Sequence, residues 1–335
     1  MPELRQDIIT GDWTVIATER ARRPQNFTSK NFEAIQSKPS FKPDCPFCPG
    51  NERETPPEVF AYRDASAPAD SGGWKVRVVP NKFPAFSQGK YSESRSGIYS
   101  IKSATGVHDV IIETPRHDIS PGLMAAAEFH MVLKAYRQRY RMIMEDDPRL
   151  EYILIFRNHG RPAGASLEHP HSQISALGLI PPVIAKELQG TQLYYEANGK
   201  CVYCDMIHEE VETGSRLLAV QDGYVAFQPF ASRVPFETWV IPINHQSRFE
   251  LEDDPSLEGL SRVMTEALKA LSISLGDPAY NYVLHTSPCH GDHFFHWHIE
   301  ILPKLTIQAG FEIGTGMYIN VARPEETAEF LRNSL

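Results

Sequence analysis

Apolar residues recur at helical spacing in two long stretches of the chain. The first stripe consists of Phe129, Leu133, Tyr136, Tyr140 and Ile143. The second stripe consists of Leu257, Leu260, Met264, Leu268, Leu271 and Leu275. Gly276 and Pro278 follow the second stripe and predict where that helix ends. Both patterns are typical of amphipathic helices whose apolar face packs on a core.

Strand-like runs flank each predicted helix in the same order. An apolar run comes before the helix, at residues 107–114 in the first case and 238–243 in the second. A β-rich run comes after the helix, at residues 152–156 and 280–284. This order predicts an α+β fold made of two halves, each an antiparallel sheet with a helix packed on it.

Cysteine and histidine residues repeat in step with these elements. Each half contains a Cys-x-x-Cys pair, a lone histidine after the apolar run, and a His-x-His pair. The first set is Cys45, Cys48, His117, His169 and His171, and the second is Cys201, Cys204, His245, His296 and His298. His169 follows His117 by 52 positions, and His296 follows His245 by 51. We infer a duplication, with halves at residues 1–187 and 188–335 that join around residues 188–200. A polar stretch at residues 87–103 is a plausible insertion in the first half.

Two thiolates and two imidazoles are a ligand set that tetrahedral zinc accepts in structural sites. We predict one zinc ion at Cys45, Cys48, His117 and His169, and a second at Cys201, Cys204, His245 and His296. A redox dithiol is the competing interpretation of a single Cys-x-x-Cys pair. The repeated order of all four ligands favours metal. Cys289 has no partner in the pattern and is interpreted as a small buried residue.

Charge and hydropathy narrow the classes of partner. The formal net charge of −9 argues against a protein that coats nucleic acid. There is no run of about 18 apolar residues, so we expect no membrane span. Residues 1–18 lack an apolar signal core, so we expect a cytoplasmic protein with reduced cysteines. The basic run Arg20, Arg22 and Arg23 is either solvated surface or a local phosphate clamp.

Candidate chemistry is concentrated in the segment from His169 to Gln173. Residues two apart on a strand share a face, so His171 and Gln173 should face the same substrate while His169 binds metal. A neutral imidazole is a good nucleophile toward phosphorus near pH 7. The Gln173 amide could hydrogen-bond a phosphate oxygen without adding charge.

The second His-x-His pair gives a weaker signal for catalysis. Both of its histidines could simply bind metal, and that interpretation competes evenly for His296 and His298. Glu300 stands where Gln173 stands in the first half. We therefore predict one active site per chain.

These motifs resemble those of galactose-1-phosphate uridylyltransferases and of their relatives, the ADP-glucose phosphorylases, both in the histidine-triad superfamily. The resemblance covers nearly the whole chain. The matching segments are residues 19–24, 45–50, 79–84, 158–173 and 310–312. It implies two tandem histidine-triad-like halves in each chain, and a homodimer with the active site near the subunit interface.

The resemblance also implies a double displacement in which His171 carries the nucleotide. His171 would attack the α-phosphorus of a nucleotide sugar, release a sugar 1-phosphate, and pass the nucleotide to a second phosphate compound. Arg20, Arg23, Asn158, Ser166 and Gln173 would contact phosphates or sugar by matching position. Asn81 and Phe83 would lie near the base and ribose, and Phe311 and Glu312 complete the predicted substrate contacts.

The chain departs from the uridylyltransferase pattern at three places. Lys82 stands where Asp is common, and a Gly-Thr-Gly run at residues 314–316 replaces a segment that meets the hexose. The second Cys-x-x-Cys pair is similar to one in the phosphorylase branch, where that pair helps bind a second zinc ion. In some uridylyltransferases the second metal sits instead among one Glu and three His, for which this chain has Glu187, His285, His296 and His298. We prefer the cysteine set because thiolates favour zinc.

The function predicted first is transfer of UMP from UDP-glucose to galactose 1-phosphate through nucleotidyl-His171. The alternative within the family is an adenylyltransferase like ADP-glucose phosphorylase, with phosphate as the acceptor. A non-catalytic zinc- or nucleotide-binding protein is the alternative of another class, and a dinucleotide hydrolase is a third reading. A catalytically degenerate protein would have lost His171 or Gln173, and both are present.

Overall fold

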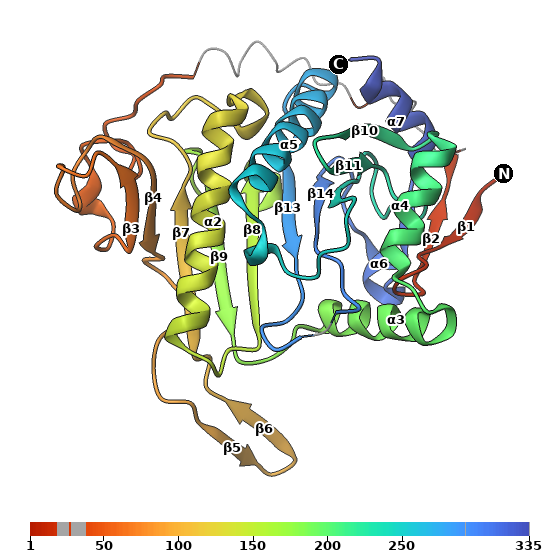
Figure 1. The fold of residues 1–335 in the computed structure, drawn as a ribbon, viewed down its shortest axis with the longest axis horizontal. Coiled ribbons are helices and arrows are strands. Elements are labelled where there is room, and N and C mark those ends of the chain that lie inside the picture. The colour runs from red at the N-terminus through yellow and green to blue at the C-terminus, as the bar shows by residue number, and fades with distance from the viewer. Residues whose placement is uncertain (19–26, 28–37, 292, 335) are drawn as a thin grey trace.

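One ten-stranded sheet forms the centre of the molecule, and every pairing within it is antiparallel (Figure 1). The computed structural model describes residues 1–18, 27, 38–291 and 293–334. From one edge of the sheet to the other, the strands are β3 (Phe60–Arg63), β4 (Trp74–Pro80), β7 (Gly106–Ile112), β9 (His171–Leu177), β8 (Tyr152–His159), β13 (Tyr280–His285), β14 (His298–Pro303), β12 (Thr238–Pro242), β11 (Tyr224–Phe227) and β10 (Leu217–Gln221).

The order of strands repeats about the middle of this sheet. From one edge inward the first half reads β3, β4, β7, β9 and β8, and from the other edge the second half reads β10, β11, β12, β14 and β13. Strands β8 and β13 meet at the centre, where Asn158 lies opposite Asn281. The expected α+β fold, with two similar antiparallel halves, is confirmed. The structure adds that both halves share one continuous sheet.

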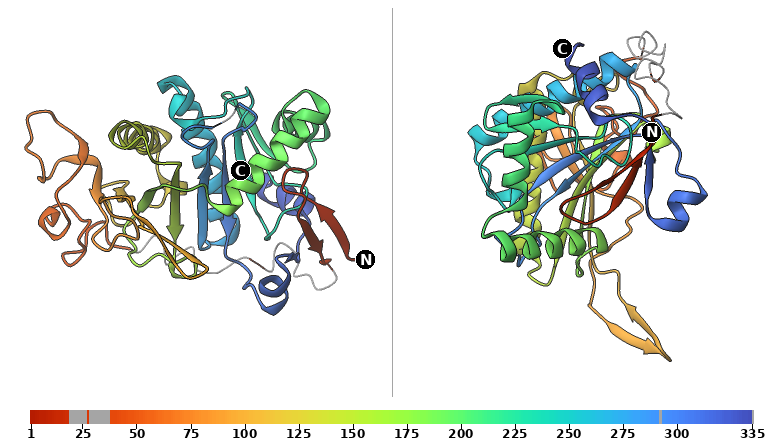
Figure 2. Two further views of the ribbon diagram at one scale, coloured as in Figure 1. Left: turned by 90° about the horizontal axis from the view of Figure 1, so that it is seen from below. Right: turned by 90° about the vertical axis from the view of Figure 1, so that its right-hand side faces the viewer.

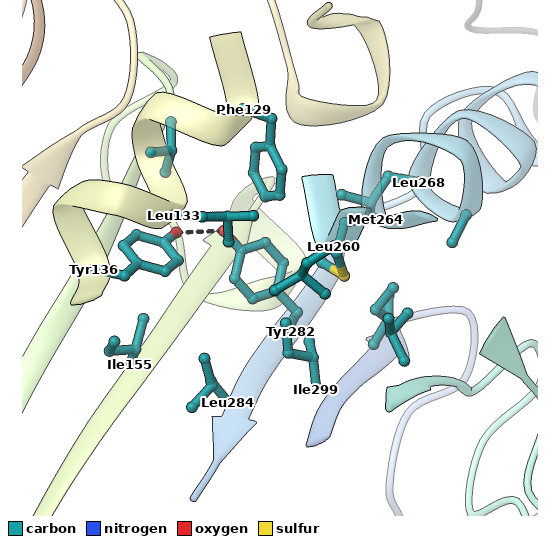
Figure 3. Close-up of a cluster of buried hydrophobic side chains, with 14 of the residues drawn as sticks. Phe129, Leu133, Tyr136, Ile155, Leu260, Met264, Leu268, Tyr282, Leu284 and Ile299 are labelled. Atoms are coloured by element: carbon teal, nitrogen blue, oxygen red, sulfur yellow. Dashed lines mark hydrogen bonds between the residues drawn. The ribbon is translucent and has the colours of Figure 1, made fainter. Parts of the chain in front are cut away.

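Two long helices cover one face of the sheet. They are α2 (Ala126–Asp146) and α5 (Asp254–Leu275), and they contain the two apolar stripes seen in the sequence (Figure 1). Asp253 caps α5 by accepting a hydrogen bond from the amide of Ser256 at 2.8 Å, and Gly276 ends the helix in the left-handed conformation. Figure 3 shows the result: side chains from both helices meet side chains of β8, β13 and β14 in one buried cluster.

Shorter elements lie around this core. The first two strands, β1 (Glu3–Gln6) and β2 (Trp13–Ile16), form a small sheet with β15 (Tyr318–Asn320) from the other end of the chain. Within the described residues, the remaining helices are α3 (Pro182–Asn198), α4 (Val202–Thr213), α6 (Gly310–Thr315) and α7 (Pro324–Arg332), with 3₁₀ turns at Glu52–Glu54, Pro121–Leu123, Arg161–Ala163 and Phe249–Leu251. Figure 2 shows β1, β2 and α6 away from the face that carries α2 and α5.

The polar stretch at residues 87–103 contains a hairpin that projects from the body (Figures 1 and 2). It consists of β5 (Glu93–Ser96) and β6 (Tyr99–Lys102), and all eight of their residues are exposed. The predicted boundary between residues 187 and 188 falls inside α3. Among the described residues, no helix combines the length and apolar character that a membrane crossing requires.

Candidate active site and metal centres

His171 opens strand β9 on the face of the sheet opposite α2. Ser172, Ile174 and Ala176 alternate with it, and the latter two pack in the core beneath the helices. His171 and Gln173 therefore point the other way, and both line the same cavity. The shared face that the sequence predicts for these two side chains is what the structure shows.

Hydrogen bonding fixes which nitrogen of His171 can act as a nucleophile. Its Nδ1 lies 2.8 Å from the carbonyl oxygen of His169, so Nδ1 carries the proton and donates it. The lone pair is then on Nε2. Burial lowers the pKa of His171 to about 4, with a further contribution from the nearby Arg157 charge. The imidazole is consequently neutral at pH 7.

The cavity beside His171 has a volume of about 800 Å³, which is ample for a nucleotide sugar. Its walls come from the Cys45 loop and the turn after it, the end of β4 with the following loop, β7, the segment before β9, and β9 itself. The lining residues include Pro43, Asp44, Phe47, Asn51, Thr55, Val79, Asn81, Lys82, Phe83, Val110, Ser166, Leu167, His171 and Gln173. Mixed apolar and amide groups of this kind suit a base, a ribose and phosphates together.

The first predicted metal set comes together next to His171. Ligand atoms of Cys45, Cys48, His117 and His169 lie within 4.8 Å of one another, and all four residues are buried. His169 donates from Nε2 to the Thr114 carbonyl at 2.8 Å, which turns its Nδ1 toward both thiols at 3.6 and 3.8 Å. Metal-binding histidines usually donate a hydrogen bond from the ring nitrogen that does not bind the metal, as His169 does here.

The chemistry of this first set fits a divalent cation. Burial raises the pKa of Cys45 to about 11, so the thiol keeps its proton unless a cation replaces it. The backbone amide of Lys42 donates to Cys48 Sγ at 3.3 Å. Asn51 donates to the carbonyls of Pro43 and Cys45, both at 2.8 Å, and so closes the loop that presents the thiols.

Phe47 links this cluster to the candidate nucleophile. It stands between the two cysteines, and its ring meets the His171 ring edge-on with 5.3 Å between centroids. The same ring lies 6.1 Å from the His169 ring. The Cys45 loop therefore positions His171 directly as well as through His169.

The second predicted metal set also comes together. Cys201, Cys204, His245 and His296 form a group with the same 4.8 Å limit, although His245 is exposed and Cys204 half-buried. His296 donates from Nε2 to the Pro242 carbonyl at 2.9 Å, as His169 does to Thr114 in the first half. Its Nδ1 then faces the two thiols at 3.7 and 4.0 Å.

The alternative second metal set needs a correction. His296 does not join Glu187, His285 and His298, because its Pro242 hydrogen bond turns its free nitrogen toward the cysteines. Glu300 takes that place, and the four residues Glu187, His285, His298 and Glu300 form a third buried group that could hold a metal ion. This third group and the Cys201 group share no ligand.

Glu300 makes the second half differ from the first in charge. Burial opposes its ionisation, but Arg233 and the imidazoles of His285 and His298 outweigh burial and lower its pKa to about 2. Arg233 lies 2.7 Å from Glu300 and also 2.7 Å from Glu237. A fixed carboxylate would repel a phosphate, whereas the neutral Gln173 amide of the first half would not.

A buried polar network supports β9 from behind. The Tyr136 hydroxyl of α2 donates to Ser172 Oγ at 2.7 Å and lies 2.5 Å from the Tyr282 hydroxyl of β13, the bond drawn in Figure 3. Arg157 and Glu113 form a buried ion pair next to these hydroxyls. Ser172 stands between His171 and Gln173, so this network fixes the strand that carries both.

A family model described as "Galactose-1-phosphate uridyl transferase, N-terminal domain" matches residues 1–181, more than half of the chain. The chain belongs to the galactose-1-phosphate uridylyltransferase family. The resemblance of its motifs to this family is thereby confirmed. The chain is an enzyme of this family's nucleotidyltransferase kind.

Relatives come from two branches of the uridylyltransferase family. An ADP-glucose phosphorylase of Arabidopsis thaliana is 37% identical over 338 residues, which cover 99% of this chain and 92% of the relative. A galactose-1-phosphate uridylyltransferase of Thermotoga maritima is 27% identical over 350 residues, covering 100% and 99%. The crystal structure of an Arabidopsis ADP-glucose phosphorylase with bound ADP-glucose has a TM-score of 0.82 and 33% identity, covering 99% of this chain and 98% of that one.

The substrate contacts implied by the family fall into three groups. Asn81, Phe83 and Ser166 line the His171 cavity, and Phe83 is 84% exposed. Asn158 is absent from the cavity wall; its side-chain oxygen accepts a hydrogen bond from the side-chain amide of Asn281 at 2.8 Å. Arg20 and Arg23 lie outside the described residues.

Phe311 and Glu312 are also absent from the cavity wall, because they lie on α6. Glu312 caps that helix by accepting a hydrogen bond from the amide of Ala309 at 2.9 Å. Phe311 is 44% exposed on the same helix. Within one chain, the structure does not bring α6 to the cavity of His171.

One residue beside the cavity was not singled out by the sequence. His108 lies in the apolar run that forms β7, and its Nε2 is 2.7 Å from Oε1 of Gln173. A lone histidine in an apolar strand is usually interpreted as a buried packing residue, so the sequence pattern did not mark His108 as functional. The available signal was its period: His108 and Val110 share a face of β7, and Val110 lines the cavity.

Proposed function

We propose that this enzyme transfers a nucleoside monophosphate from a nucleotide sugar through a covalent bond to His171. The observation that carries the proposal is the neutral His171, with its lone pair on Nε2, lining an 800 Å³ cavity beside Gln173. The substrates are a small nucleotide sugar and phosphate compounds. Gln173 acts as a hydrogen-bond donor to an α-phosphate oxygen, where negative charge is concentrated during transfer.

The reaction proceeds in two displacements. In the first, Nε2 of His171 forms a bond to the α-phosphorus, and the bond from that phosphorus to the sugar 1-phosphate oxygen breaks. The sugar 1-phosphate leaves with that electron pair, and the imidazole gains a positive charge while Nδ1–H stays bonded to the His169 carbonyl. In the second, an acceptor phosphate oxygen bonds to phosphorus, the N–P bond breaks, and neutral His171 returns.

We infer that the donor is ADP-glucose and the acceptor is phosphate, so that the products are glucose 1-phosphate and ADP. The support is the higher identity to an ADP-glucose phosphorylase, 37% against 27% for a uridylyltransferase over similar lengths. The second Cys-x-x-Cys pair and the Gly314-Thr315-Gly316 run point the same way. Transfer of UMP from UDP-glucose to galactose 1-phosphate is the second candidate, favoured by the matching family model.

Two zinc ions per chain are part of the proposal. The donors of each set are two thiols and two imidazole Nδ1 atoms gathered within 4.8 Å, a combination that zinc accepts. At the first site the zinc would hold the Cys45 loop and His169, and through them Phe47 and His171. Its contribution is structural, since all four of its ligands come from the protein.

We also propose the division at residues 187 and 188 and a homodimer. α6 bears Phe311, Ile313 and Glu312 and lies away from the cavity of its own chain, with Ile313 76% exposed. A second copy is the partner that would give α6 a surface to cover. The family's expected position for the active site, near the subunit interface, would place this helix at the partner's cavity.

The test compares donors and acceptors in full kinetic measurements. ADP-glucose and UDP-glucose are each paired with phosphate, glucose 1-phosphate and galactose 1-phosphate, and kcat/KM is measured for all pairs. We expect ADP-glucose with phosphate to give the highest value. A preference above about 1000-fold for UDP-glucose with galactose 1-phosphate would favour the second candidate. Lack of turnover with every pair, in protein shown to contain zinc, would refute nucleotidyl transfer itself.

A further inference from the structure

The side-chain amide of Gln173 is held by two donors from the same direction. His108 Nε2 lies 2.7 Å from Gln173 Oε1, and Asn81 Nδ2 donates to the same oxygen at 3.3 Å. A carbonyl oxygen has two lone pairs, and here both are engaged. The NH₂ group of Gln173 is then the part of the amide left to meet a ligand in the cavity.

A backbone hydrogen bond sets the tautomer of His108. The amide N–H of Ala85 donates to His108 Nδ1 at 3.0 Å, so that nitrogen must be unprotonated. In the neutral ring the proton is therefore on Nε2. His108 can only donate from Nε2, so the Gln173 atom at 2.7 Å must be an oxygen. Asn81 Nδ2 lies 3.3 Å from the same Nε2 and is a second donor to that oxygen.

The loop after β4 reinforces this arrangement. The amide of Asn81 donates to the His108 carbonyl at 2.9 Å, which ties the loop to β7. The Asn81 side-chain oxygen accepts from the amide of Phe83 at 2.9 Å, so its NH₂ group points to Gln173. Rotating the Gln173 amide by half a turn would set its NH₂ against two other donors.

We propose that His108 is a positioning residue that locks the Gln173 amide with its NH₂ group toward the α-phosphate. The inference rests on the proposed function for the identity of that phosphate. His108 itself is absent from the cavity wall and acts through Gln173. The same ring also couples amide orientation to the loop from Asn81 to Ala85, which supplies Phe83 to the cavity.

Two substitutions separate the two nitrogens of His108. In His108→Gln the side-chain amide reaches the place of Nε2 and can still donate to Gln173. In His108→Asn the amide reaches only the place of Nδ1, so the bond from Ala85 can survive but the bond to Gln173 is lost. Both replacements are neutral and polar, which makes each the control for the other.

The measurement is the single-turnover rate of covalent labelling with nucleotide sugar, together with the dissociation constant of the donor. We expect His108→Asn to slow labelling by about 10- to 100-fold, below the ~100- to 1000-fold loss of a whole oxyanion donor, with little change in the dissociation constant. His108→Gln should retain most of the rate. In a Gln173→Ala background neither His108 variant should slow labelling further.

Three results would overturn the assignment to His108. One is an equal loss for the Asn and Gln variants, another is no loss for His108→Asn, and the third is the same loss of rate in the Gln173→Ala background. If the wild-type enzyme forms no adduct, the proposed function fails separately. The amide lock is then judged by ¹⁵N NMR of the His108 ring: an Nε2–H tautomer supports it, and an Nδ1–H tautomer contradicts it.

Discussion

The network behind β9 predicts a specific loss of stability when one hydroxyl is removed. Tyr136→Phe deletes an oxygen that bonds Ser172 at 2.7 Å and Tyr282 at 2.5 Å, in a residue only 1% exposed. The Ser172 hydroxyl then loses its donor in a dry interior. Leaving buried polar groups without a partner costs about 1–3 kcal/mol. Tyr282 limits the loss, since its hydroxyl can still reach Glu113 at 3.4 Å.

Tyr140 supplies a matched control one helical turn along α2. It is 0% exposed, and among the described residues its hydroxyl has no hydrogen-bond partner. Tyr140→Phe therefore removes an unsatisfied group and should leave stability unchanged or slightly raise it. Both variants delete one buried oxygen from the same helix, so their difference isolates the hydrogen bonds of Tyr136.

Differential scanning calorimetry at fixed zinc and protein concentration measures the two effects. For a chain of this size, 1 kcal/mol corresponds to about 1.5 °C in Tm. Tyr136→Phe should lower Tm by about 1.5–4.5 °C, and Tyr140→Phe should not lower it. Labelling of His171 should slow in Tyr136→Phe, because Ser172 is its neighbour on β9. Equal melting temperatures for the two variants would refute the reasoning.

Further predictions concern metal, pH and packing. Cys48→Ser should lower the zinc content measured by elemental analysis by about one ion per chain, whereas Cys289→Ser should leave the zinc content unchanged. Equal zinc contents in the two variants would show that Cys48 is not a ligand. Burial lowers the pKa of His171 to about 4, so the ring gains a proton only as the pH drops toward that value. The labelling rate of zinc-replete enzyme should therefore be flat between about pH 6 and 8 and fall only below that range. An inflection near the ordinary histidine pKa of 6.5 would contradict this prediction. Gly106→Ala would place a Cβ 1.9 Å from a carbonyl oxygen of β9, so this variant should lower Tm strongly. Gly314→Ala is the control, because its Cβ would meet nothing within 4 Å and its Tm should not fall. Similar Tm values for the two variants would show that β7 and β9 can separate freely.

Elements with a strong period were predictable from the sequence. The stripes on α2 and α5 are long enough for the helical repeat to be unmistakable, and Gly276 ends α5 as expected. The metal sets were predictable for another reason: four ligands recur in the same order, and the spacing from the lone histidine to the His-x-His pair differs by one residue between the halves. Repetition carries information that a single Cys-x-x-Cys pair lacks.

Features that depend on ring orientation or on distant pairing were not predictable. The His296 ring faces the cysteines because its Nε2 bonds the carbonyl oxygen of Pro242. Glu300, and not His296, is therefore the fourth member of the third group. The sharing of one sheet by both halves depends on the edge pairing of β8 with β13, for which neither strand has a local signal. His108 escaped notice because its partner, Gln173, is 65 positions away.

The position of the covalent nucleotide tests the central claim most directly. The zinc-loaded enzyme is mixed with ADP-glucose, quenched in alkali, digested and examined by mass spectrometry, with UDP-glucose in a parallel sample. We predict one nucleoside monophosphate on the peptide that contains His171, none in His171→Asn, and undiminished labelling in His298→Asn. An adduct on any other residue, or turnover by His171→Asn at the wild-type rate, would contradict the account.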